Sequence, residues 1–171
     1  MLSAAYARTA ATYNSVMNTR FYTAAAQLSD AERKLQRGAF WGSIHGTLSH
    51  LLWADRMWMS RFDDWVAPIQ QLAESDGLFS DFEELRKARE DDDRRITAWA
   101  ASLAEAWLVG DQTWFSGASQ RELTLPRTLL VMHLFNHQTH HRGQVHAMLT
   151  ACGLKVGDTD LPLVLAAPSF S

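Results

Sequence analysis

The chain has 171 residues and a mass of 19.3 kDa, so we expect a single domain over residues 1–171. Apolar residues make up 47% and charged residues 20% of the sequence, which excludes a disordered chain. The net charge of −3 argues against a nucleic-acid binder, because such proteins carry a basic excess. No apolar run approaches the roughly 18 residues that a membrane span needs. The single cysteine, Cys152, excludes an internal disulfide and fits a reducing cytoplasm.

The N-terminal stretch from about Ser3 to Gln27 is predicted to form the first long helix. It has two arginines and no acidic residue before Asp30, a composition that also resembles a mitochondrial presequence. We favour a bundle helix, because a stripe of side chains recurs at steps of three and four residues and needs a partner to cover it. This stripe consists of Tyr6, Thr9, Tyr13, Val16, Met17, Arg20 and Phe21.

Ser29 and Asp30 offer capping side chains after this helix, and Gly38 interrupts the chain before a second helix at about 40–62. Residues 80–83 read Ser-Asp-Phe-Glu, the Ser-x-x-Glu pattern of a capping box. This box is predicted to open a third helix that reaches about Val109.

A fourth helix is predicted from Pro126, which is tolerated in a first helical turn, to Gly153. Leu123-Thr-Leu125 suggests a short extended piece before it, but no hydrophobic alternation is long enough to indicate a sheet. The last eighteen residues are expected to form a tail over the helices. The sequence therefore predicts an all-α protein, a four-helix bundle with a short C-terminal tail.

Histidines gather in the fourth predicted helix, where His133, His137, His140 and His141 fall within nine residues. His137 and His141 are four residues apart and both lean toward the apolar face, so their imidazoles can reach one metal ion. His146 faces away and is expected to contact solvent.

A site with two histidines is incomplete, and the second helix offers His50 as a third ligand. His50 points inward among small and apolar neighbours, which leaves room for an ion with an open position. His45 points elsewhere and is expected at the surface or behind the ligands. The alternative is a set of hydrogen-bonded core histidines, but burying several unpartnered imidazoles costs free energy that a metal would recover.

The chain resembles the DinB family of damage-inducible proteins over nearly its whole length. The resemblance lies in Gly42-Ser-Ile-His-Gly-Thr-Leu-Ser-His50-Leu-Leu-Trp-Ala-Asp-Arg-Met-Trp58, in His137-Gln-Thr-His-His-Arg-Gly-Gln144, and in the Leu28-Ser-Asp-Ala-Glu and Ala-Cys-Gly segments. It implies a four-helix bundle whose connections are not all simple hairpins, a homodimer, and a divalent metal, nickel or zinc, held by three histidines. Position by position, the implied ligands are His50, His137 and His141.

Related thiol-dependent enzymes, the bacillithiol transferases and the mycothiol-dependent maleylpyruvate isomerase, share this bundle and triad. The kinship implies a metal-dependent hydrolase or thiol transferase that acts on a small molecule, with a low-molecular-weight thiol as a second cofactor. The alternative is a metal-binding stress-response or interaction protein without turnover. The enzyme and the non-catalytic protein differ in whether a cleft leads to the metal and whether the metal keeps an exchangeable water.

The residues near the triad refine these expectations. Gln138 follows His137, so the general-base glutamate of a His-Glu-x-x-His protease is absent and peptide hydrolysis is disfavoured. His133 and His140 are placed either to carry protons or to bond a backbone carbonyl. Cys152 has no activating partner in the sequence and is not expected to be a nucleophile. The residues expected to line the approach to the ion include Thr47, Trp58 and Gln144, and Trp53 is expected near the site.

Overall fold

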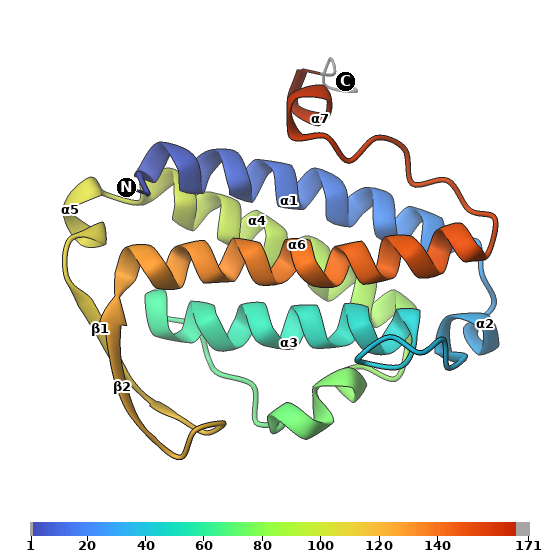
Figure 1. The fold of residues 1–171 in the computed structure, drawn as a ribbon, viewed down its shortest axis with the longest axis horizontal. Coiled ribbons are helices and arrows are strands. Elements are labelled where there is room, and N and C mark those ends of the chain that lie inside the picture. Colours follow the sequence, from blue (N-terminus) through green and yellow to red (C-terminus); the bar gives the residue numbers. More distant parts are fainter. Residues whose placement is uncertain (1, 167–171) are drawn as a thin grey trace.

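The computed structural model describes residues 2–166, and four long helices in this range pack lengthwise as a bundle (Figure 1). These are α1 (Ala4–Ala25), α3 (Ile44–Phe62), α4 (Phe82–Ser102) and α6 (Arg127–Ala151). The shorter elements are α2 (Asp30–Lys34), the 3-10 helix η1 (Leu72–Gly77), α5 (Glu105–Leu108), β1 (Asp111–Ser116), β2 (Arg121–Pro126) and α7 (Leu161–Ala166). The predicted fold class is confirmed.

The order of helices around the bundle differs from that of a simple up-and-down bundle. Helix α1 packs against α4 and α6, and α3 packs against the same two helices, so the consecutive helices α1 and α3 lie on a diagonal. Helices α3 and α4 run in the same direction (Figure 1), and the segment 63–81 returns along the bundle to join them. Helices α4 and α6 form the other diagonal, so none of the three connections between the long helices is a hairpin between neighbouring antiparallel helices.

Side-chain caps set the starts of three long helices. The side chains of Ser3, Ser43 and Asp81 each accept a hydrogen bond from the backbone N–H three residues on. The second helix therefore starts at Ile44 and not near residue 40, because Gly42 has a φ of 73° and cannot be helical. The third helix is capped by Asp81, one residue after the Ser80 that the sequence suggested.

The third helix ends at Ser102, and the expectation that it reaches Val109 was wrong. Leu103 is buried and adopts an extended backbone with ψ of 119°, which turns the chain toward α1. There the Glu105 carboxylate accepts a hydrogen bond from the Ala4 N–H at 2.9 Å. The short helix α5 is thus fixed against the start of the bundle.

An antiparallel hairpin links α5 to α6, although the sequence shows no hydrophobic alternation long enough to indicate a sheet. Strands β1 and β2 pair in a register that places Trp114 opposite Leu123, and the hydroxyls of Thr113 and Thr124 lie 2.8 Å apart. The extended piece expected at Leu123–Leu125 is confirmed as part of β2. The hairpin lies beside one end of the bundle (Figure 1).

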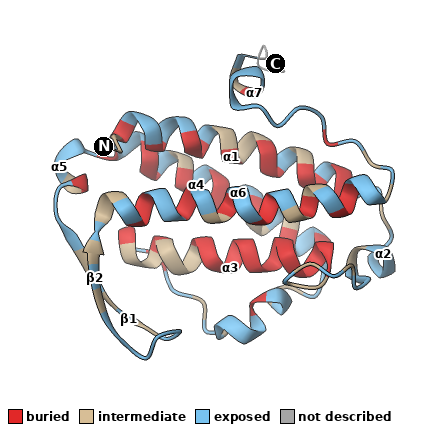
Figure 2. Cartoon of the chain, viewed as in Figure 1, coloured by how far each residue is buried: buried red, intermediate tan, exposed pale blue. Residues whose placement is uncertain are grey.

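The core lies on the inward faces of the long helices (Figure 2). Helix α1 buries mainly small side chains, including Ala7, Ala10 and Ala11, which let it approach α4 and α6 closely. The predicted stripe was therefore only partly right, because Met17 and Phe21 are buried while other members are exposed or half-buried. The helix itself packs in the bundle as expected.

A layer of buried polar side chains crosses the middle of the bundle. The Asp55 carboxylate accepts hydrogen bonds from Arg89 at 2.6 Å and from Gln138 at 2.9 Å. The Gln138 carbonyl accepts one from Arg142 at 3.0 Å. Along each long helix this layer separates one cluster of buried apolar residues from another.

The tail after α6 lies along α1, as expected. The Tyr13 hydroxyl donates to the Thr159 carbonyl at 2.6 Å, and the Arg20 guanidinium donates to the Asp158 carbonyl at 2.8 Å. Val164 of α7 is buried. The part of the expected tail at residues 167–171 lies outside the described residues. None of the helices that the structure describes is long and apolar enough to cross a membrane.

Candidate metal centre

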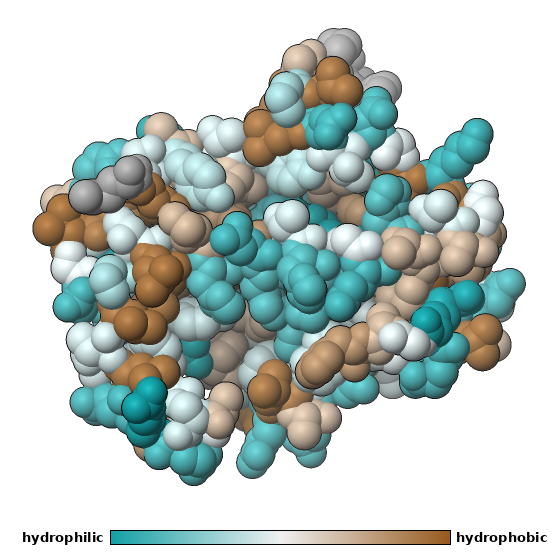
Figure 3. Space-filling model, in the orientation of Figure 1, coloured by the Kyte–Doolittle hydropathy of each residue, from teal (hydrophilic) through white to brown (hydrophobic). Residues whose placement is uncertain are grey.

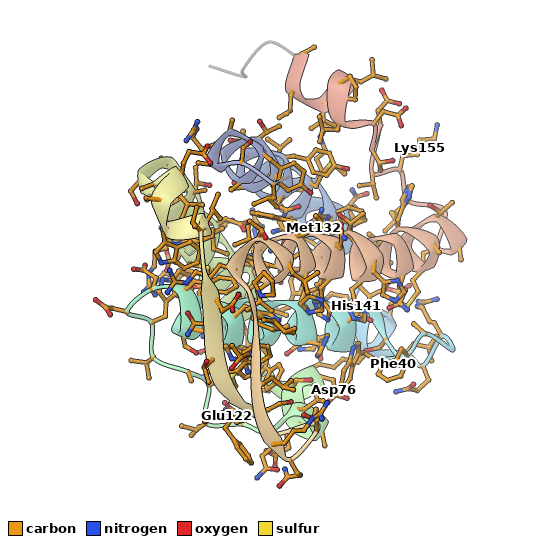
Figure 4. All side chains as sticks on the ribbon, turned by 60° about the vertical axis from the view of Figure 1, so that its left-hand side comes forward. Phe40, Asp76, Glu122, Met132, His141 and Lys155 are labelled. Carbon is orange, nitrogen blue, oxygen red and sulfur yellow. The ribbon has the colours of Figure 1, made fainter. Side chains whose placement is uncertain are left out.

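The neighbouring helices α3 and α6 bring His50, His137 and His141 together. One ring nitrogen from each of the three lies within 4.8 Å of the others, and the Nε2 atoms of His50 and His137 are 3.3 Å apart. Two nitrogens bound to one tetrahedral ion at ~2.0–2.1 Å would be separated by about 3.3 Å. Figure 4 shows His141 on the side of α6 that faces α3. The residues present therefore fit a divalent ion.

Ser75 of η1 fixes the orientation of the His50 ring. The Ser75 hydroxyl donates to the Leu72 carbonyl at 2.7 Å, so its oxygen accepts the hydrogen bond from Nδ1–H of His50 at 2.8 Å. The Nε2 lone pair of His50 is then free and points toward His137. Trp41 stacks on a face of this imidazole, with 3.9 Å between ring centroids and an interplanar angle of 21°.

Gln144 fixes the orientation of the His141 ring in the same way. Its side-chain oxygen lies 2.7 Å from Nδ1 of His141 and accepts the proton of that nitrogen. The Nε2 atom of His141 is left as a free ligand atom. Such partners behind metal-binding histidines fix the tautomer and the ring direction.

The environment keeps the three imidazoles neutral. Burial, and to a lesser extent the neighbouring histidines, lowers the pKa of His50 and of His137 to about 3. Burial also lowers the pKa of His141, although its hydrogen bond to Gln144 opposes that shift. Only the neutral ring can coordinate a metal, so all three are ready to bind at neutral pH.

The other histidines have different surroundings. His45 points away from the triad as expected, but it is buried and not at the surface, and its Nε2–H donates to the Phe79 carbonyl at 2.7 Å. His146 is half-buried and packs edge-on against Phe21, so the expectation of a solvated ring was only partly right. His133 contacts Trp58, and the exposed His140 lies beside His141.

An open cleft of about 1110 Å³ leads to His50 and His137. Its walls come from α3, from the hairpin and from the segment 68–73, and in Figure 3 it opens below the centre of the face. Trp53 and Trp58 line it as expected, whereas Thr47 and Gln144 do not. The Thr47 hydroxyl instead donates to the Ser43 carbonyl within the helix.

Sequence reasoning missed three residues of this region, Trp41, Ser75 and Trp114. Trp41 and Ser75 lie in irregular or 3-10 segments, and Trp114 lies in the unexpected hairpin. No spacing relates any of them to the histidines. Gln138, which replaces the protease glutamate, points into the buried polar layer and bonds Asp55 and Arg142.

Comparison with known proteins concerns the family and the fold of the chain. The sequence model described as the DinB family matches residues 1–168. No curated protein matches the chain in sequence. Among solved structures, the chain is similar to YfiT from Bacillus subtilis, described as a probable metal-dependent hydrolase with an unusual four-helix bundle topology. The two are 14% identical, the match covers 91% of this chain and 92% of YfiT, and the TM-score is 0.63.

Proposed function

The chain belongs to the DinB family, and from that premise we propose that it is a metal-dependent enzyme that hydrolyses a small molecule. The observation that carries the proposal is the position of the three histidines, which converge where a large cleft reaches the bundle. The description of YfiT as a probable metal-dependent hydrolase supports hydrolysis as the reaction class. Cytoplasmic action would suit the free Cys152.

The donor set favours a catalytic ion over a structural one. Within residues 2–166, no fourth histidine, cysteine or carboxylate joins the cluster. Structural zinc sites are closed by four protein ligands, whereas catalytic sites keep an open position. Three neutral imidazoles suit zinc or nickel. The cleft is large enough for a small-molecule substrate, because such sites measure roughly 300–1000 Å³.

The protein residues have separable roles in this reaction. Ser75 and Gln144 hold His50 and His141 in their binding tautomers. His133 lines the cleft one helical turn before His137, which supports a role in taking a proton from the attacking water and returning it to the leaving group. When bound, a divalent ion supplies Lewis acidity and lowers the pKa of a water that it binds.

The ligand assignment is tested by metal analysis of protein purified without a His tag. We expect about one equivalent of zinc or nickel in the wild type and a sharp loss in His50→Ala, His137→Ala and His141→Ala. His45→Ala and His146→Ala are the controls and should keep the metal, because both rings point away from the cluster. Full occupancy in His141→Ala would remove the triad from consideration.

The reaction class is tested by an activity screen. Chromogenic esters, amides and phosphoesters are offered to metal-loaded protein, and a set of low-molecular-weight thiols with electrophiles tests for thiol transfer instead. Turnover should disappear after chelation, return with zinc or nickel, and be absent in His141→Ala. Metal binding without any turnover, together with a cobalt spectrum indifferent to azide, would favour a non-catalytic metal protein.

A further inference from the structure

We propose that the cleft binds molecules that join a flat apolar body to an anionic group, and that the Arg61 guanidinium binds the anionic group. This inference rests on the proposed function only in placing the reacting part of the molecule at the histidines. It adds the chemical class of the substrate and the residue that selects it.

Arg61 lies on the same face of α3 as His50. The two are eleven residues apart, close to three helical turns, which places their Cα atoms about 16 Å apart along the axis. Both side chains line the cleft. The histidines and Arg61 therefore mark two separate positions along one cleft, so a bound molecule would carry its anionic group away from its reacting centre.

Two indole rings hold the Arg61 guanidinium in place. Its Cζ atom lies 4.4 Å from the ring centroid of Trp58 and 5.4 Å from that of Trp114. Trp58 and Trp114 contact each other edge to face at 5.7 Å. Stacking of this kind uses the faces of the guanidinium and leaves the N–H groups at its edge available for hydrogen bonds.

Those N–H groups have no partner in the part of the chain that the structure describes. Arg61 makes no hydrogen bond there, and no carboxylate oxygen lies within 4.0 Å of its nitrogens. The other arginines of the bundle interior differ, because Arg56 and Arg89 pair with aspartates and Arg142 bonds Gln138. Arg61 is half-buried, and this partial burial lowers its pKa. A bound anion would supply charged hydrogen-bond acceptors to these N–H groups.

The charge of the cleft also favours an anion. Among the described residues that line it, Arg61 is the one with a formal charge, and no aspartate or glutamate is present. A concave surface with low-dielectric walls and charge of one sign concentrates ligands of the opposite sign.

The walls of the cleft between the histidines and Arg61 suit a flat apolar group. Trp53, Trp58 and Trp114 line the cleft, and Trp53 is fixed by the hydrogen bond from its Nε1–H to the Gln70 carbonyl at 2.9 Å. Indole rings offer large apolar faces that prefer offset or edge-on contact with another ring. The combination indicates an aromatic or similarly planar carboxylate, phosphate or sulfonate.

The test compares two probes that differ in charge alone, 2-naphthoate and 2-naphthamide, by isothermal titration of the full chain. We expect the wild type to bind the carboxylate at least tenfold more tightly, as a charge-assisted hydrogen bond implies. Arg61→Gln should lose this preference while binding the amide as before. Arg61→Lys should retain part of it, because the charge remains and the planar fork is lost.

Arg95→Gln is the matched control, because Arg95 also stacks on an indole, 3.6 Å from the Trp65 centroid, but does not line the cleft. It should keep the full preference. If the preference for the carboxylate survives in Arg61→Gln and disappears in His50→Ala, the anion binds at the metal. That result would overturn the role of Arg61 and leave the proposed metal site standing. Failure of the wild type to bind either probe, or to discriminate between them, would also overturn it, whatever the metal analysis shows.

Discussion

Each of two candidate ligands uses one ring nitrogen for orientation and leaves the other free. Nδ1 of His50 donates to Ser75, and Nδ1 of His141 donates to Gln144. The three rings form a triangle, with centroid distances of 5.2 Å from His50 to His137, 4.5 Å from His137 to His141 and 4.9 Å from His50 to His141. The triad is therefore arranged before any ion binds, which lowers the entropic cost of forming the site.

Ser75→Ala should weaken metal binding by about 10- to 100-fold, the usual cost of removing a hydrogen bond behind a metal-binding histidine. It would leave the buried Nδ1–H of His50 without an acceptor, which costs about 1–3 kcal/mol of stability. Competition with a chromogenic chelator measures the affinity. Ser102→Ala is the control, because that hydroxyl bonds the Trp99 carbonyl at the far end of α4. Equal affinities in the two variants would contradict the role of Ser75.

The lowered pKa values predict how pH affects the metal-free protein. A histidine in the unfolded chain takes its proton near pH 6.5, whereas His50 and His137 in the folded protein do so at about 3. Between these values the unfolded state binds more protons, so its free energy falls relative to the folded state as pH decreases. Each histidine therefore removes up to about 1.4 kcal/mol of stability per pH unit over this window.

Urea unfolding of chelated protein at about pH 7, 6 and 5 measures this effect. The loss of stability on acidification should be smaller in His50→Ala than in the wild type. Burial raises the pKa of Asp55 to about 6, and that group acts in the opposite direction, but it is present in both proteins and cancels in the difference. Parallel pH profiles would contradict the lowered pKa of His50.

The four long helices could be predicted from the sequence, but the segments that connect them could not. Periodicity and caps are local properties, so the four helices and most of their ends follow from the sequence. Leu103 breaks the third helix because it is buried where the chain turns toward α1, and this depends on tertiary packing. The hairpin is half-exposed, and Trp114 and Leu125 pack against the core. Two inward apolar residues are too few to give a clear alternation of apolar and polar residues in the sequence.

The segment before α3 depends on a close backbone approach at Gly46. A Cβ atom there would lie 2.6 Å from the Trp41 carbonyl oxygen. Gly46→Ala should therefore displace the Trp41 segment, remove its stacking on His50 and destabilise the protein by about 1–3 kcal/mol. Metal affinity should fall as well, because the His50 ring loses the contact that limits its rotation. Thermal unfolding and metal titration measure the two effects.

Gly143→Ala is the matched control within α6. A Cβ atom at that position meets nothing within 4 Å, so the change should stabilise the helix by roughly 0.5–1 kcal/mol. It should leave metal binding unchanged, although residue 143 lies between His141 and Gln144. Equal effects of the two substitutions would show that Gly46 is not required for the approach of Trp41.

The candidate ligands could be predicted from the sequence, but the layer of buried polar side chains in the middle of the bundle could not. The spacing of His137 and His141 and the inward position of His50 can be seen in the sequence. The charges of Asp55, Arg89 and Arg142 look like those of a solvated helix face until the packing is known. All three are buried: Arg89 donates to Asp55, and Arg142 is linked to Asp55 through Gln138. This polar layer joins α3, α4 and α6 across the middle of the bundle.

We expect two chains to associate, and a group of exposed apolar residues on α1 and α6 offers a surface for this contact. Tyr6 on α1 and Leu129 and Met132 on α6 are 43%, 47% and 41% exposed. Met132 lies on the opposite side of α6 from His141 (Figure 4), so contact through this face would leave the cleft open. A two-fold dimer would bury the same face of both copies.

We therefore predict a mass near twice 19.3 kDa in light scattering at micromolar concentration. The double variant Leu129→Glu/Met132→Glu should be a monomer, because two buried carboxylates in each copy would oppose association. Phe115→Glu is the control, since Phe115 is 64% exposed but lies on the hairpin at the cleft. A wild-type mass near 19.3 kDa would contradict the dimer. If Phe115→Glu alone causes dissociation, the contact lies at the mouth of the cleft instead. A second copy bound there would control access to the histidines.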